Sequence, residues 1–188
     1  MTGIGLLLLP IVVSTLAVFI LSAIIHTALP WHRSDFATIP NEDGVLNALR
    51  PFALPPGDYM APSPLTAGGM RSPEFMDKRN RGPVFLMTVM PNGAFSMGKY
   101  LGVWFVWVLI VAIVVGFITG HIVAPGGNRH VVFHHATVLT FLSYGMANVP
   151  ASIWYHRKWS TTGKDLIDAA IYGVATGLVF MWMWPVAM

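Results

Sequence analysis

The chain has no cysteine, and only 10% of its 188 residues are charged. The absence of cysteine excludes disulfides, thiolate metal sites, iron–sulfur clusters and cysteine nucleophiles. The shortage of charge excludes an ordinary water-soluble domain, in which about 25% of the residues are charged. Hydrophobic residues make up 55% of the chain, so we expect lipid rather than water to cover much of its surface.

Common catalytic motifs are missing as well. The sequence contains no Walker loop, no G-x-G-x-x-G, no H-E-x-x-H and no recognisable Ser–His–Asp order, which argues against nucleotide-dependent, zincin and hydrolase chemistry. We therefore expect a protein that is not an enzyme. The net charge of +3 does not indicate a nucleic-acid partner, because the basic residues border apolar segments, where they act as topology signals.

Four apolar segments are long enough to cross a bilayer, which takes about 20 residues. We predict a single all-α integral membrane domain with transmembrane helices over residues 4–29, 100–120, 130–154 and 166–184. The first segment lacks the basic start and the small-residue cleavage site of a signal peptide, so we expect it to be retained as an anchor.

The loop over residues 30–97 contains ten of the fourteen prolines, which excludes a long helix or a Rossmann-type unit. Two short helices are expected, one over residues 41–50 and one opened by Ser72 and closed by Gly82. Residues 84–90 are expected to form a strand that returns through residues 94–97 as a small hairpin.

The basic residues predict the orientation. Ten of the eleven Lys and Arg residues lie within residues 30–99 or 155–164, and only Arg129 lies on the other side of the predicted spans. Because basic residues concentrate on the cytoplasmic side, we expect a multi-pass protein of the bacterial inner membrane with both termini in the periplasm.

Polar residues recur at helical spacing on one face of three predicted spans. They are Thr15, Ser22 and His26 in the first span, His130, His134, Thr137, Thr140, Tyr144 and Asn148 in the third, and Asp165, Asp168, Tyr172 and Thr176 in the fourth. Such faces are typical of hydrogen bonds between membrane helices, and the alternative is a path for a small solute. We interpret Asp165 and Asp168 as residues of the first turns of the last helix, which favour the positive helix end.

Small residues recur four apart, a spacing that lets membrane helices approach closely. They are Gly98 and Gly102, Gly116 and Gly120, and Ala169, Gly173 and Gly177. These residues predict tight helix packing, either inside this chain or against another subunit.

Four histidines are expected to converge at the outer membrane boundary: His121, His130, His134 and His135. They suit a metal site, and Met181, Met183 and Met188 at the same level would favour copper. Haem ligation is a second interpretation, and uncoordinated interfacial histidines are the simplest one. The segment from His130 to His135 resembles one histidine box of the membrane fatty-acyl desaturases and hydroxylases, but that family requires several boxes and a cytoplasmic site.

Taken together, these features predict a non-catalytic accessory or structural subunit of a larger membrane assembly or homo-oligomer. Its expected partners are the lipid bilayer and other membrane subunits or copies of itself, and no cofactor is required. The alternatives are a small redox protein that binds a metal or haem through the histidines, and a carrier of a small solute.

Overall fold

The computed structural model describes residues 1–64 and 69–187, and the chain divides into two compact units. The first, here called the membrane unit, comprises residues 1–37 and 96–188. The second, here called the loop unit, comprises residues 38–95. Each unit is described by itself.

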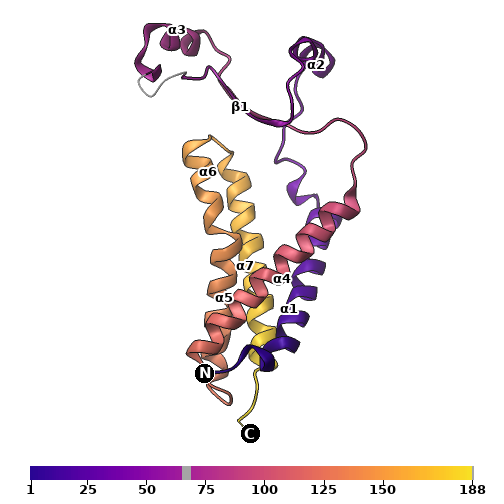
Figure 1. The fold of residues 1–188 in the computed structure, drawn as a ribbon, viewed down its shortest axis with the longest axis vertical. Helices are drawn as coiled ribbons and strands as arrows, with labels where there is room; N and C mark the ends of the chain where they lie inside the picture. The colour runs from indigo at the N-terminus through magenta and orange to yellow at the C-terminus, as the bar shows by residue number, and fades with distance from the viewer. Residues whose placement is uncertain (65–68, 188) are drawn as a thin grey trace. The chain divides into compact units, whose positions relative to one another are not determined.

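The membrane unit is helical (Figure 1). Its N-terminal part comprises η1 (Ile4–Leu7), α1 (Leu8–Ala23), the π-helical turn η2 (Ile24–Ala28) and η3 (Pro30–His32). The remainder comprises α4 (Met97–Ile122), α5 (Arg129–Tyr144), η6 (Met146–Asn148), α6 (Val149–Trp154) and α7 (Trp159–Trp182).

Three helical stretches of the described chain are long and apolar enough to cross a membrane: Ile4–Ala28, Met97–Ile122 and Trp159–Trp182. They correspond to the first, second and fourth predicted spans, and they establish the coarse prediction of a helical membrane protein. The third predicted span is not one helix, because the chain breaks at Gly145 and continues through η6 into α6, which has Pro150 in its first turn. Since α5 has 16 residues, it is shorter than a typical spanning helix.

The last helix begins earlier than the sequence suggests. α7 starts at Trp159, not near residue 166, so Asp168 is its tenth residue. The interpretation of Asp168 as a residue of the first turns is therefore wrong, because the amphipathic segment around Thr161 and Thr162 is itself helical and both threonines are buried.

Small residues set the closest approaches between helices. A Cβ atom at Gly173 would lie 2.8 Å from the carbonyl oxygen of Thr137, so α7 touches the backbone of α5 there. Gly116 on α4 packs against side chains of Ile11 and Phe180, both almost fully buried. The Gly173 contact joins α7 to the middle of α5, and the Gly116 contact joins the last turns of α4 to α1 and α7.

Toward the other end, α4 stays beside α1 but diverges from α5 and α7 (Figure 1). Gly98 and Gly102 lie in this first part of α4, and within the described chain no atom comes within 4 Å of a Cβ placed at either position. The divergence leaves the helices open at this end of the unit.

The loop unit contains α2 (Glu42–Leu49), η4 (Arg50–Phe52), β1 (Gly57–Ala61), η5 (Gly69–Arg71), α3 (Pro73–Arg81) and β2 (Phe85–Val89). Both predicted short helices are present. The Asn41 side chain accepts a hydrogen bond from the Gly44 backbone, and the Ser72 side chain accepts one from Phe75.

The predicted strand is also present, but its predicted partner is wrong. β2 pairs with β1 in antiparallel register, with Tyr59 opposite Met87. The segment after the turn cannot return as a strand, because Met97 already begins the apolar helix α4.

Candidate functional site in the membrane unit

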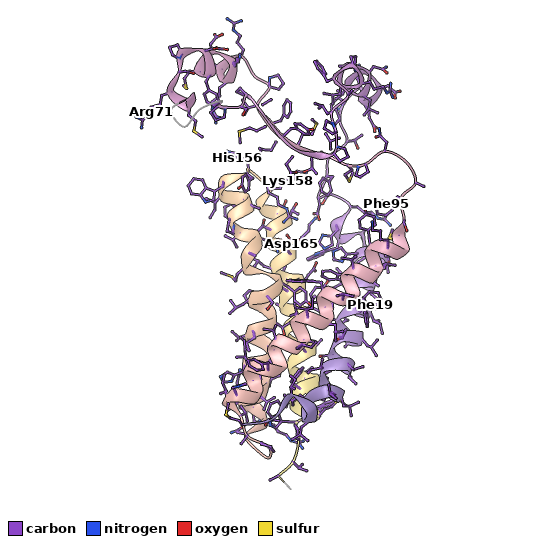
Figure 2. All side chains as sticks on the ribbon, in the orientation of Figure 1. Phe19, Arg71, Phe95, His156, Lys158 and Asp165 are labelled. Atoms are coloured by element: carbon purple, nitrogen blue, oxygen red, sulfur yellow. The ribbon has the colours of Figure 1, made fainter. Side chains whose placement is uncertain are left out.

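A cavity of about 810 Å³ opens between α1, α4, α5 with η6, and α7. Figure 2 labels Phe19 on α1 and Asp165 on α7, which both line it. Its wall is mixed: aromatic side chains from α1, α4, α5 and α7 meet polar and charged ones. The polar lining residues include Ser22, His26, Thr27, Ser143, Asn148, Arg157, Asp165 and Asp168. We call this space the polar cavity.

Asp168 is the most deeply buried charged residue of the polar cavity, with 5% of its surface exposed. Its Oδ2 atom lies 2.8 Å from Nε2 of His32. Its other oxygen, Oδ1, is buried and has no hydrogen-bond partner among the described residues. A buried carboxylate oxygen without a partner is uncommon in proteins and indicates that a further group belongs beside it.

His32 connects this carboxylate to a second one. Its Nδ1 atom lies 2.6 Å from Oδ2 of Asp35, while Nε2 faces Asp168. Burial by itself would lower the pKa of His32, but the hydrogen bonds to Asp35 and Asp168 outweigh it and raise the pKa above its ordinary value. In this arrangement both ring nitrogens donate, so the imidazole carries a proton on each.

Asp35 is held in turn by residues of α7. Lys164 Nζ lies 2.8 Å from Asp35 Oδ1, and it also donates to the Ser34 hydroxyl. Burial opposes the charged form of Asp35, but the bonds from Lys164 and His32 lower its pKa below the usual value. The segment after η3 is thereby bonded to the first turns of α7.

His26 lies in the π-helical turn η2 and stacks on His32, with ring centroids 4.3 Å apart and planes 5° from parallel. Its Nδ1 atom is 3.0 Å from the backbone oxygen of Ser22. Single π turns in helices are often found at functional sites. Here the π-helical turn follows α1 directly and places His26 at the edge of the polar cavity.

Aromatic side chains form another wall. The Trp104 indole donates a hydrogen bond to the Ser22 hydroxyl over 2.9 Å. Tyr144 packs against both Trp104 and Tyr172, with ring centroids 5.9 Å and 5.4 Å away. The Tyr172 hydroxyl is buried and, within the described residues, has no hydrogen-bond partner.

The polar-stripe residues predicted from the sequence are divided between this wall and the helix contacts. Tyr144, Asn148 and Tyr172 line the polar cavity. Thr140 and Thr176 are buried away from it, and Thr137 lies against α7 at Gly173.

The small-residue stripes lie in different surroundings as well. Gly116, Gly120, Gly173 and Gly177 each face another helix or chain segment at short range, and Ala169 is buried opposite Gly145. Gly98 and Gly102 face open space.

The four histidines predicted as metal ligands are not brought together as a cluster. Among residues 1–64 and 69–187, one group of three or more His, Asp or Glu side chains has its ligand atoms within 4.8 Å of one another, and it consists of His26, His32 and Asp168. His121 and His135 instead point Nδ1 at backbone oxygens of their own helices. Met188, one of the predicted methionine ligands, lies outside the described residues.

Sequence reasoning did not find His32 or Asp35 as site residues, because both lie in the loop after the first span, 133 to 136 residues away from Asp168. One signal was available: the stretch Trp31 to Asp35 carries a histidine and an acid directly beside the membrane boundary. Polar side chains at the membrane boundary can contact the ends of neighbouring helices, as His32 and Asp35 contact α7 here.

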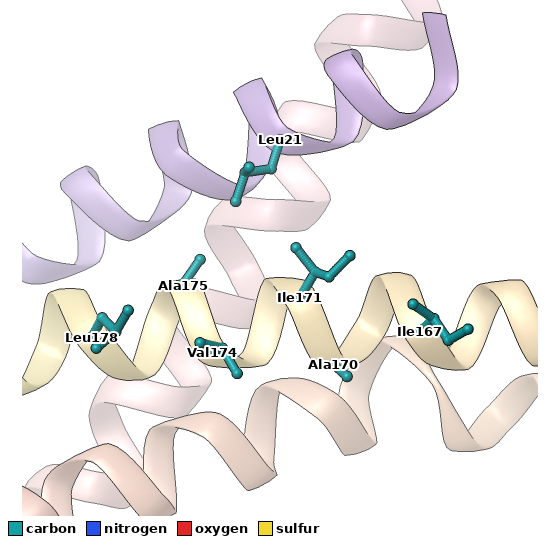
Figure 3. Close-up of a pocket in the computed structure, with 7 residues that line it drawn as sticks. All are labelled: Leu21, Ile167, Ala170, Ile171, Val174, Ala175 and Leu178. Atoms are coloured by element: carbon teal, nitrogen blue, oxygen red, sulfur yellow. The ribbon is translucent and has the colours of Figure 1, made fainter. Parts of the chain in front are cut away.

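A second hollow, of about 480 Å³, lies between α1 and α7 and is lined by Leu21, Ile167, Ala170, Ile171, Val174, Ala175 and Leu178 (Figure 3). Its lining side chains are aliphatic, so it offers no polar recognition.

No family model, curated protein or solved structure matches the chain. Function is therefore inferred from the residues and their geometry.

Proposed function

We propose that the chain is a four-span protein of the bacterial inner membrane that acts as a non-catalytic subunit of a larger assembly or homo-oligomer. In this arrangement α5, η6 and α6 together make the third crossing in chain order, and α7 makes the fourth. Its support is the close packing of α5 along α7, where Gly173 meets the Thr137 backbone, because a helix packed along a spanning helix shares its depth.

The orientation proposed for these crossings follows the basic residues. With both termini in the periplasm, the loop unit and the turn at residues 155–158 lie on the cytoplasmic side, which then holds ten of the eleven Lys and Arg residues.

The observation that carries the subunit role is the contrast between the two ends of α4. At its C-terminal end Gly116 and Gly120 are packed inside the unit, whereas Gly98 and Gly102 meet no atom within 4 Å in the part of the chain described. Around Gly102 the α4 surface is apolar and exposed, including Val103 and Val106. In lipid, small residues at such a surface favour close contact with another helix.

Association of the intact chain tests this role. Gly102→Leu fills the small-residue surface and is expected to shift the purified protein in mild detergent from the oligomer or complex toward the monomer, because the partner backbone can no longer approach. The readout is the native mass of the particle.

The matched control is Gly163→Leu, the same increase in size at a glycine of α7 whose added Cβ atom also meets nothing within 4 Å in the described chain, and it should leave the mass unchanged. A wild-type protein that is monomeric and copurifies with no other chain would contradict the proposed role.

A further inference from the structure

We propose that His26, His32 and Asp168 form a binding site for a divalent metal ion, with zinc as the ion that suits these ligands best. Two imidazole nitrogens and one carboxylate oxygen are borderline and hard donors that zinc and cobalt accept readily. The site lies in the membrane unit at the polar cavity, away from the histidines near the α4–α5 turn.

The hydrogen bonds of the two histidines leave the correct nitrogen for a metal. Nδ1 of His26 is engaged with the Ser22 backbone oxygen, and Nδ1 of His32 with the Asp35 carboxylate. Metal-binding histidines almost always donate their other ring N–H to a carbonyl or carboxylate in this way, which fixes the ring and its tautomer. Each ring therefore presents Nε2 as the ligand atom.

The pair Asp35 and His32 matches the carboxylate–histidine–metal arrangement in particular. Asp35 is itself fixed by Lys164, and their side chains are 9% and 17% exposed. A rigid and largely buried supporting carboxylate orients the imidazole before the metal arrives.

Asp168 supplies the third ligand and the reason for a cation. Its Oδ1 atom is buried and unpartnered within the described chain, and only 5% of the residue's surface is exposed. The nearby cations are already matched to other carboxylates: Lys164 pairs with Asp35 and Arg157 with Asp165. A divalent ion would satisfy the free oxygen, and its two positive charges would replace the single charge of the protonated His32 imidazole.

The ligand atoms already lie close together, but the His26 and His32 rings are stacked with planes 5° from parallel, so their Nε2 atoms do not yet point at a common position. All ligand atoms lie within 4.8 Å of one another, and His32 Nε2 and Asp168 Oδ2 are already 2.8 Å apart. Two nitrogens that share one zinc ion at about 2.1 Å each can be at most about 4.2 Å apart. A shared ion lies in the plane of each imidazole ring, so the His26 ring must first rotate out of its stack on His32, which the exposure of its side chain allows.

In the structure the Nε2–H group of His32 donates to Asp168, so an ion that binds at Nε2 would displace this proton into solvent. With three protein ligands, a fourth position remains on the side of the polar cavity, where water completes the coordination. Such an open position is typical of zinc sites that exchange ligands.

Cobalt titration of the full chain tests the site. The purified protein in detergent micelles is stripped with a chelator, and Co²⁺ is added while the visible absorption of four-coordinate cobalt is recorded. We expect one ion per chain, displaced by one equivalent of Zn²⁺. His26→Gln and Asp168→Asn should each abolish this absorption, and Asp35→Asn should weaken binding by about 10- to 100-fold.

The matched control is the double variant His121→Gln with His134→Gln, which removes two exposed histidines and should leave binding unchanged. Because His26 is exposed, His26→Gln keeps the helical circular dichroism signal and separates loss of a ligand from loss of the fold. Cobalt absorption that survives His26→Gln, that disappears in the control variant instead, or that never reaches one ion per chain would overturn the proposal.

Discussion

At the scale of single residues, the best-defined interactions of the membrane unit are the charged ones beside the polar cavity. Asp35 accepts from Lys164 and from His32, and Asp168 accepts from His32. These groups are largely removed from water, so each depends on its partner much more than an exposed ion pair does.

Removing Lys164 should therefore cost more than removing a nearby lysine. Lys164→Met removes one of the two cationic partners of Asp35 and leaves His32 as the other, and we expect it to lower the free energy of unfolding by about 2–3 kcal/mol. Chemical unfolding in mixed micelles measures the difference. Lys158→Met is the control, because Lys158 donates to the Ser34 backbone oxygen and, within the described residues, pairs with no carboxylate. If both variants lowered the free energy of unfolding equally, the ion pair between Lys164 and Asp35 would not be the cause.

The sequence predicts which polar residues share a helix face, but not which of them meet. Asp168 and Tyr172 are on one face of α7 by spacing alone, whereas the contact between Asp168 and His32 joins residues 136 positions apart. A loop residue that reaches back to a helix leaves no periodic pattern, so His32 and Asp35 required the structure.

At the scale of secondary-structure elements, the sequence predicts the long helices better than the break between α5 and α6. Hydropathy predicts three of the helices well, because long apolar stretches have few alternatives in lipid. The break after Tyr144 was not predicted, since Met146 to Pro150 contains no charge that would end an apolar segment. Gly145 ends the helix there, where a Cβ atom would lie 3.0 Å from that of Ala169.

Gly173→Ala should loosen the contact between α7 and α5. The added methyl would meet the Thr137 carbonyl oxygen at 2.8 Å, and backbone cannot move aside as a flexible side chain does. We expect a loss of about 1–3 kcal/mol in the free energy of unfolding.

Gly163→Ala is the matched control on the same helix, because in the described structure nothing lies within 4 Å of its added Cβ atom. There, alanine should be neutral or stabilising by up to about 1 kcal/mol through helix propensity. Similar destabilisation at both positions would show that packing against α5 is not the cause.

At the scale of the whole molecule, the proposed four-span topology makes a prediction about sides. With four crossings, residues 124 and 160 lie on opposite sides of the membrane, whereas with three crossings they lie on the same side. Because the natural chain has no cysteine, a single introduced thiol is the only one to react.

We expect Ala124→Cys to react with a membrane-impermeant maleimide in spheroplasts, and Ser160→Cys to react only after lysis. Both positions are exposed in the structure, so burial does not explain a difference in labelling. Gly5→Cys, near the N-terminus, should behave like Ala124→Cys. Labelling of both Ala124→Cys and Ser160→Cys in intact spheroplasts would place the two residues on the same side and rule out a crossing through α5, η6 and α6.

The position of Trp104 has a practical consequence. Its indole is fixed by the Ser22 hydroxyl, packs against Tyr144 and forms part of the cavity wall. Its fluorescence should therefore respond when a paramagnetic ion or a quencher enters the space beside it. The protein thus contains an intrinsic optical reporter, with Trp104→Phe as the blank, and occupancy can be followed without attaching a dye.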